Sequence, residues 1–116
     1  MDDVPVIAIV DDDQSLRRSL LRVVESAGYK AEAFAGGREF LEWLPSNRVA
    51  CLVLDVHMSE MSGFDVRDRM AVPIIFITAH DDVATRVRLE QSGAAGHLRK
   101  PFDAATLLEA IRTALR

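Results

Sequence analysis

The sequence predicts an α/β domain in which a parallel sheet carries helices on both faces. Three short apolar runs, at 6–10, 51–55 and 74–78, have the length of strands that are buried on both sides. Segments in which apolar residues recur at helical spacing alternate with these runs. This alternation indicates right-handed strand–helix–strand crossovers and therefore a parallel sheet.

Five strands and five helices follow one another along the 116 residues. The predicted strands are 6–10, 29–34, 51–55, 74–78 and 96–98. The predicted helices are 14–27, 38–44, 64–70, 82–92 and a last one that follows Asp103 as its N-cap. Gly28 and Gly93 follow two of these helices, where glycine is favoured, and Pro45 follows another. The run 29–34 alternates small apolar with charged residues, which is typical of an edge strand with one face in water.

Apolar residues at helical spacing predict the inward faces of three helices. They are Leu16, Leu20, Val23, Val24 and Ala27 in the first, Phe40, Leu41 and Leu44 in the second, and Ala104, Leu107, Leu108, Ile111 and Leu115 in the fifth. In the fourth helix Val83 and Val87 have the spacing of one helix face. Glu90 stands where the next residue of that face is expected, and Leu89 lies on another face. Either this helix is rotated and short, the interpretation we favour, or it exposes apolar surface to a partner.

Composition fits one globular domain spanning residues 1–116, with 49% apolar and 28% charged residues. No apolar run approaches the ~20 residues that span a bilayer, and the start at Met1 is acidic, so we expect no membrane span, no secretory signal and a cytoplasmic location. The single cysteine, Cys51, lies in an apolar run and is expected to be buried and inert. The net charge of −4 argues against direct nucleic-acid binding, and the arginines of the first helix (Arg17, Arg18 and Arg22) are interpreted as a solvated face.

Reactive polar groups stand at the carboxyl ends of four predicted strands. They are the carboxylates Asp11, Asp12, Asp13 and Asp55, the hydroxyl of Thr78 and the amine of Lys100. Ligands of open parallel sheets bind beyond these strand ends. Because carboxylates only a few ångströms apart repel one another, some must be protonated or a cation must lie among them, and oxygen ligands suit Mg²⁺. Asp13 has a simpler interpretation, which we favour, as the N-cap of the first helix.

A carboxylate oxygen of Asp55 that is left free by the metal could accept a phosphoryl group, forming an aspartyl-phosphate. Such a transfer needs charge neutralisation and in-line positioning more than acid–base help. Mg²⁺ and the Lys100 ammonium would each cover one phosphoryl oxygen, and the Thr78 hydroxyl would complete the cage. Arginine at position 100 would fit the same pocket differently, because its head group is larger and planar.

Four short motifs in this order resemble those of the receiver domain of two-component response regulators. They are VDDD at 10–13, LDVHM at 54–58 with Gly63 eight residues after Asp55, FITA at 76–79, and LRKPF at 98–102. The resemblance covers essentially the whole chain and implies a flavodoxin-like doubly wound (βα)5 fold with strand order 2-1-3-4-5. The segment from His80 to Phe102 resembles the branch whose receivers often precede a LuxR-type helix-turn-helix DNA-binding output domain.

The resemblance also implies roles for individual residues, carried over one by one. Asp55 is the phosphoacceptor. The Mg²⁺ ligands are Asp55, Asp12, Asp11 through a water molecule, and the backbone carbonyl of His57. Thr78 is the switch hydroxyl, Lys100 binds the phosphoryl group, and His97 stands at a second switch position. The Lys100–Pro101 peptide bond is expected to be cis.

The implied function is a phosphorylation-activated signalling switch that changes the surface of the fourth helix and fifth strand. Its implied partners are a sensor histidine kinase or phosphotransfer protein, a downstream output domain in transcription regulation, and a second copy in a phosphorylation-dependent homodimer. It is not expected to be an enzyme beyond accepting the phosphoryl group and slowly releasing it. Two rival hypotheses are a phosphate-independent receiver-like interaction module and a Mg²⁺-dependent phosphatase, although His57 stands where a phosphatase has its second aspartate.

The chain departs from the family pattern at several positions. Ser59 replaces the usual proline after the phosphoacceptor, so that loop is expected to be more mobile. The third helix is short, and Glu90 replaces an apolar residue. His97 has two open interpretations, as a switch residue or as an ordinary imidazole. His57 and His80 flank the site, where they either influence water attack on the acyl-phosphate or are ordinary surface histidines.

Overall fold

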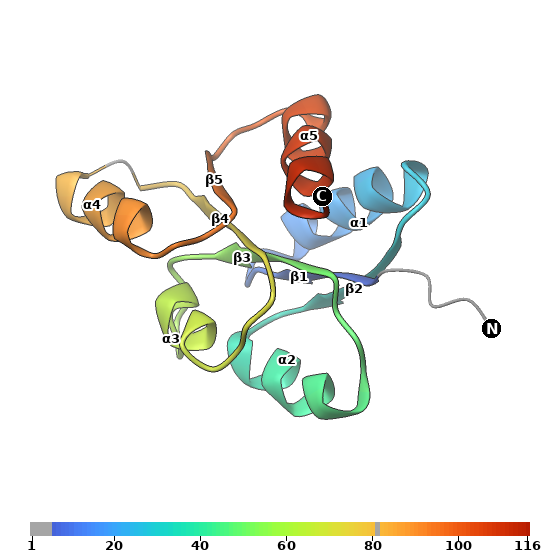
Figure 1. The fold of residues 1–116 in the computed structure, drawn as a ribbon, viewed down its shortest axis with the longest axis horizontal. Helices are drawn as coiled ribbons and strands as arrows, with labels where there is room; N and C mark the ends of the chain where they lie inside the picture. The colour runs from blue at the N-terminus through green and yellow to red at the C-terminus, as the bar shows by residue number, and fades with distance from the viewer. Residues whose placement is uncertain (1–5, 81) are drawn as a thin grey trace.

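The computed structural model describes residues 6–80 and 82–116, so the acidic start of the chain and Asp81 lie outside the described residues. Its core is one five-stranded sheet in the order β2-β1-β3-β4-β5, as predicted, and every neighbouring pair is parallel (Figure 1). The strands are β1 (Val6–Val10), β2 (Lys30–Phe34), β3 (Cys51–Asp55), β4 (Ile74–Thr78) and β5 (Gly96–Arg99). The helices are α1 (Gln14–Ser26), α2 (Gly37–Trp43), α3 (Gly63–Arg67), α4 (Val83–Gln91) and α5 (Ala104–Ala114), and a 3₁₀ turn, η1 (Leu44–Ser46), follows α2.

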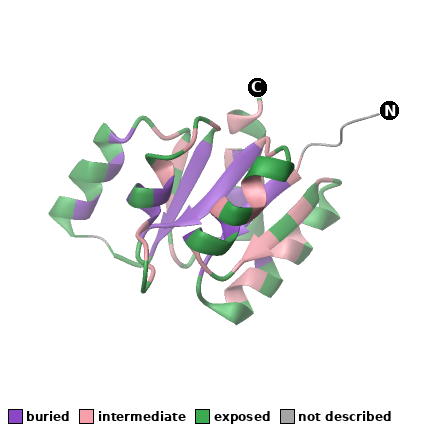
Figure 2. Cartoon of the chain, turned by 90° about the horizontal axis from the view of Figure 1, so that it is seen from below, coloured by how far each residue is buried: buried purple, intermediate pink, exposed green. Residues whose placement is uncertain are grey.

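The register of the strands explains why their polar ends meet. Val10 pairs with Leu54, Asp55 with Ile77, and Thr78 with Arg99, so β1, β3, β4 and β5 end at nearly the same level. The residues that follow each strand therefore converge on one edge of the sheet. The interior of the three central strands is fully buried, which is why their sequences are almost continuously apolar (Figure 2).

Two hydrophobic clusters lie on opposite faces of the sheet. On one face α1 and α5 pack through Leu20, Val24, Leu107 and Ile111 against alternate strand residues. On the other face Phe40 of α2 and the residues of α3 pack against the remaining strand positions. Most of the predicted inward residues of α1, α2 and α5 are buried or partly buried, but Ala27 and Ala104 are exposed, so the prediction was wrong for these two.

Side chains of the preceding residues start four of the helices. Asp13, Ser62, Asp82 and Asp103 each accept a hydrogen bond from a backbone N–H in the first turn of the next helix, in α1, α3, α4 and α5 respectively. The prediction for Asp103 is confirmed. Asp13 has the geometry of the N-cap interpretation, with its Oδ1 3.2 Å from the Leu16 amide.

Helix α3 is shorter than the predicted 64–70, and the reason is its hydrogen bonding. After Arg67 the amides of Arg69 and Met70 donate three residues back, to Val66 and Arg67, instead of four. This tighter pattern ends the α-helix before Pro73 is reached. The prediction of a short third helix holds, but the helix is even shorter than expected.

Helix α4 is rotated relative to the face that Val83 and Val87 would form. Its buried residues are Thr85 and Leu89, whereas Val83 and Val87 are 66% and 42% exposed. The hydroxyl of Ser92, just after the helix, donates to the Leu89 carbonyl at 2.6 Å and is buried with it. Glu90 is consequently exposed and does not disturb the core. The rotated, short interpretation is therefore confirmed, although the rotation also leaves the two valines exposed.

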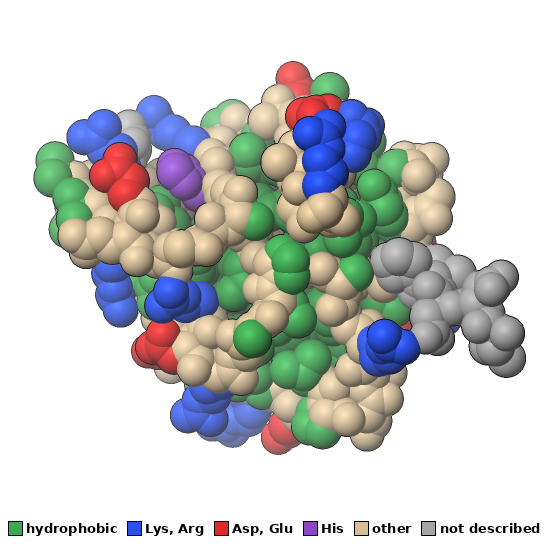
Figure 3. Space-filling model, in the orientation of Figure 1, with side chains coloured by type: hydrophobic (Ala, Val, Ile, Leu, Met, Phe, Trp, Pro, Cys, Tyr) green, Lys and Arg blue, Asp and Glu red, His purple; other side chains and the backbone are tan. Residues whose placement is uncertain are grey.

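None of the helices among the described residues combines the length and the apolar character that crossing a membrane requires. On the face drawn in Figure 3 the basic side chains stand in separate groups, several with acidic side chains beside them. Cys51 is buried, and burial raises the pKa of its thiol to about 12, in agreement with an inert thiol.

Gly63 lets the start of α3 approach the end of β3. A Cβ atom at this position would lie 2.5 Å from the backbone oxygen of Asp55 and 3.0 Å from the Cα atom of Val56. The Gly63 amide donates to the Val56 carbonyl at 2.9 Å, so the two segments cannot separate without losing this bond. The glycine that belongs to the second motif is therefore required by space next to Asp55.

We predict that Gly63→Ala lowers the free energy of unfolding by about 1–3 kcal/mol, because backbone must move to admit the methyl group. Gly96→Ala is the matched control, since a Cβ there meets no atom within 4 Å, and its effect is expected to stay within about 0.5 kcal/mol. Urea denaturation measures both. Equal effects of the two substitutions would contradict this steric account.

Candidate functional site

Three carboxylates meet at the carboxyl ends of β1 and β3. Ligand oxygens of Asp11, Asp12 and Asp55 all lie within 4.8 Å of one another. Asp11 is fully buried and Asp55 is 4% exposed, whereas Asp12 faces solvent. Among the described residues this is the one group of three or more acidic, histidine or cysteine side chains close enough to hold a metal ion.

Each oxygen of Asp11 has a donor within hydrogen-bond distance. Its Oδ1 accepts from the Asp13 amide, its Oδ2 from Lys100 Nζ, and its backbone oxygen from Arg17 Nη1, each at 2.8 Å. A carboxylate with both oxygens engaged in this way is better suited to orienting a metal-bound water than to direct ligation. Both carboxylate oxygens of Asp11 therefore already have partners within the protein.

Lys100 lies between two carboxylates. Its Nζ is 2.8 Å from Asp11 Oδ2 and 3.6 Å from Asp55 Oδ2. Partial burial lowers the pKa of Lys100, but its hydrogen bond to Asp11 and the charges of Asp55 and Asp11 outweigh burial and leave that pKa above its usual value. The ammonium is therefore charged and held close to Asp55. The Lys100–Pro101 peptide bond is cis, as the resemblance implies.

The carboxyl group of Asp55 resists ionisation. Burial is the main cause, and the charge of Asp11 adds to it, so the pKa of Asp55 is raised to about 6 even though Lys100 acts in the opposite direction. One Oδ1 contact with the His57 amide, at 3.4 Å, gives weak additional support to the charged form. Negative charge exceeds the single positive charge of Lys100 in this group of three carboxylates, and a divalent cation would compensate the excess.

Thr78, which ends β4, is held in a local turn. Its Oγ1 accepts a hydrogen bond from the His80 amide at 2.9 Å, and its side chain is buried. The hydroxyl therefore stands at the edge of the site with a backbone partner of its own. The hydroxyl in turn donates weakly to the His80 carbonyl, at 3.4 Å.

Two histidines stack beside the site. The rings of His57 and His80 have centroids 3.9 Å apart and planes tilted by 36°. Burial and the neighbouring His80 lower the pKa of His57, which keeps its ring neutral at pH 7. His97 lies elsewhere, with an exposed side chain on β5, two residues before the partner of Thr78 in the sheet.

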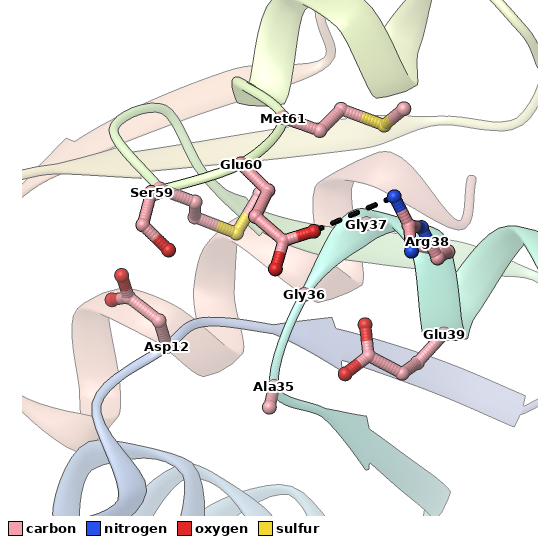
Figure 4. Close-up of a pocket in the computed structure, with 10 residues that line it drawn as sticks. Asp12, Ala35, Gly36, Gly37, Arg38, Glu39, Ser59, Glu60 and Met61 are labelled. Carbon is pink, nitrogen blue, oxygen red and sulfur yellow. Dashed lines mark ion pairs between the residues drawn. The ribbon is translucent and has the colours of Figure 1, made fainter.

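A cavity of about 330 Å³ opens beside Asp12 (Figure 4). Its walls are the segment from Ala35 to Glu39 and the loop from Met58 to Met61. In the close-up the Asp12 carboxylate points toward Ser59, and an exposed ion pair between Arg38 and Glu60, at 3.6 Å, joins the two walls. The acidic group is therefore open to solutes on the Asp12 side.

The donor set fits a hard divalent cation. All donors are carboxylate oxygens, the type of ligand that Mg²⁺ prefers, and the exposed Asp12 makes the group accessible from solution. The structure brings together Asp11, Asp12, Asp55, Thr78 and Lys100, with His57 directly beside them, and it leaves His97 apart. Sequence reasoning did not connect Arg17 with this site, because an arginine on an amphipathic helix gives no signal of the backbone carbonyl that it reaches.

The raised pKa of Asp55 predicts how stability depends on pH without metal. A folded-state pKa near 6, above the ordinary 3.8, means that stability falls as pH rises between these values. Asp55→Asn is therefore expected to raise the free energy of unfolding by about 1–3 kcal/mol at pH 7.5 and by close to nothing at pH 4. Chemical denaturation in chelator at both pH values measures this, and Asp12→Asn should give a smaller gain. An equal gain at both pH values would contradict the burial argument.

Comparison with known proteins agrees with this geometry. Residues 7–112 match the family model described as the response regulator receiver domain. The chain is 41% identical over 120 residues to the response regulator protein TmoT of Ectopseudomonas mendocina, an alignment that covers 99% of this chain and 54% of TmoT. The chain spans about half the length of the curated relatives it matches.

Solved structures share the same fold. A response regulator receiver protein from Burkholderia phymatum is 40% identical with a TM-score of 0.87, over 96% of this chain and 94% of that chain. The chemotaxis protein CheY4 of Vibrio cholerae is 29% identical with a TM-score of 0.89, over 97% of this chain and all of that chain. By sequence and by fold, the chain belongs to the family of response regulator receiver domains.

Proposed function

We propose that this receiver domain is a phosphorylation-activated switch that takes a phosphoryl group onto Asp55 in the presence of Mg²⁺. The observation that carries the proposal is the position of Asp55, a nearly buried carboxylate with the Lys100 ammonium 3.6 Å away and two further carboxylates within metal-binding distance. Such an arrangement suits phosphoryl transfer, which depends on charge neutralisation and positioning.

Each residue has a distinct proposed task. Asp12 and Asp55 would hold the ion directly, together with the backbone carbonyl of His57, while Asp11 would act through water. Bound Mg²⁺ would supply positive charge to the phosphoryl oxygens as the transfer proceeds. Lys100 would move from Asp11 to a phosphoryl oxygen, a short shift, because it already stands between the two carboxylates.

The donor is proposed to be a phosphohistidine of a sensor kinase or of a phosphotransfer protein. An Asp55 carboxylate oxygen attacks phosphorus, a P–O bond forms, and the P–N bond of the donor breaks. The electron pair of that bond returns to the imidazole nitrogen, so no external base is needed on the acceptor. The product is an acyl-phosphate that slowly hydrolyses, and we therefore propose a switch and not a turnover enzyme.

The transferred group would act on Thr78. A phosphoryl dianion on Asp55 would offer the Thr78 hydroxyl a charged acceptor, in competition with its present weak donation to the His80 carbonyl at 3.4 Å. Movement of the loop after β4 would bias a two-state equilibrium that includes α4 and His97. A complete flip of such an equilibrium requires roughly 5 kcal/mol of differential stabilisation.

The biological setting is also a proposal. Since the matched relatives are about twice as long, the domain is proposed to control an output domain that binds DNA, in the cytoplasm, in transcription regulation. A homodimer formed on phosphorylation is a further proposed partner. The domain itself is not proposed to bind nucleic acid.

The test is incubation with acetyl phosphate and Mg²⁺ followed by intact mass measurement. We predict one added phosphoryl group on the wild-type chain, none on Asp55→Asn, and none when Mg²⁺ is removed by chelator. Asp68→Asn, which removes an exposed carboxylate paired with Arg67, is the matched control and should retain the adduct. No adduct at saturating donor would contradict the proposal and favour a phosphate-independent interaction module.

A further inference from the structure

We propose that Arg17 is a positioning residue for the turn of residues 11–13, which joins β1 to α1 and carries the proposed metal ligand Asp12. This inference rests on the proposed function. Arg17 reaches back from the first turn of α1 and donates from Nη1 to the backbone oxygen of Asp11 at 2.8 Å. Its side chain is half-buried, whereas its neighbour Arg18 is exposed. Arg17 touches none of the groups expected to react, so any influence on them must pass through the Asp11 backbone.

The contact holds one side of Asp12. The Asp11 carbonyl belongs to the peptide group that leads into Asp12, so fixing this carbonyl fixes the direction in which Asp12 leaves the strand. On the other side Asp13 is held, because its amide donates to Asp11 Oδ1 and its own side chain caps α1. Within the described part of the chain the Asp12 carboxylate itself has no hydrogen-bond or ion-pair partner.

This arrangement leaves the Asp12 carboxylate available while its backbone is restrained. A ligand that is fixed before the ion arrives loses less conformational freedom on binding than a ligand on a loose turn. The Arg17 backbone adds to the restraint, since its amide donates to the Asp13 carbonyl at 3.0 Å. Arg17 therefore binds both the first and the last residue of the turn, Asp11 through its side chain and Asp13 through its main chain.

The charge of Arg17 and its positioning role predict opposite changes in divalent-ion affinity when Arg17 is replaced, so an affinity measurement distinguishes them. The guanidinium is a positive group close to a cation site, so by charge alone its removal would tighten divalent-ion binding. If Arg17 positions the turn, its removal must weaken binding despite that charge effect. Arg18 offers a matched control, because Arg18→Met removes the same charge from the next residue of the helix without breaking a described contact.

The experiment measures Mn²⁺ binding by electron paramagnetic resonance of the free ion, with Mg²⁺ competition, on the wild-type chain and on its variants. We expect Arg17→Met to weaken binding on the order of five-fold, the typical effect of one lost hydrogen bond, and Arg18→Met to leave it unchanged or slightly tighter. Arg17→Lys, which retains a donor, should recover part of the loss. Arg17→Gln, whose side chain is too short to reach the Asp11 carbonyl, should weaken binding as Arg17→Met does. It replaces Arg17→Met in the measurement if that variant fails to fold.

A second readout requires neither metal nor activity. In metal-free protein the NMR shifts of the Asp11 carbonyl carbon and the Asp12 amide nitrogen should change in Arg17→Met and stay in place in Arg18→Met. Binding by Arg17→Met that equals or exceeds binding by Arg18→Met would overturn the inference. Failure of the wild-type chain to bind the ion would instead contradict the proposed function, so the two failures are distinguishable.

Discussion

The arrangement of the site depends on one electrostatic constraint, the placing of two buried carboxylates and a third exposed one within 4.8 Å of one another. The Lys100 ammonium lies within ion-pair distance of both buried carboxylates. Burial of Asp55 and the neighbouring charge of Asp11 raise the pKa of Asp55 to about 6, although Lys100 acts in the opposite direction. A divalent ion would compensate the negative charge of this pocket, and it would thereby support the transfer chemistry proposed above.

The fold makes this constraint tolerable. The parallel strands end at nearly the same level, which places the acidic residues at one edge of the sheet. The middle of each central strand is apolar, so the repulsion stays out of the hydrophobic core. Caps and close contacts then fix the loops, with Asp13 beginning α1 and Gly63 packing directly on the Asp55 backbone. At the same edge the Thr78 hydroxyl accepts a hydrogen bond from the His80 amide, a local loop contact outside the hydrogen-bond ladder of the sheet.

Much of the fold could be predicted from sequence. Strands such as 51–55 and 74–78 are buried on both faces, and their continuous apolar runs indicate central positions in a sheet that is covered on both sides. The site could also be predicted, because the carboxyl ends of parallel strands meet at one edge of the sheet and the polar residues follow these ends. They are Asp11, Asp55, Thr78 and Lys100. The phase of α4 was harder, since Thr85 and Ser92 are polar residues on a buried face, satisfied by local hydrogen bonds that no apolar pattern reveals. The contact of Arg17 with Asp11 was beyond reach for a similar reason, since its acceptor is a backbone atom.

The most direct test of the central claim is a crystal structure of the chain grown with Mg²⁺ and beryllofluoride, a stable mimic of the phosphoryl group. We predict a beryllofluoride adduct on Asp55, an ion held by Asp12, Asp55 and the His57 carbonyl, and Lys100 turned from Asp11 toward the adduct. A pocket without ion or adduct, in which Lys100 still bridges Asp11 and Asp55, would contradict it.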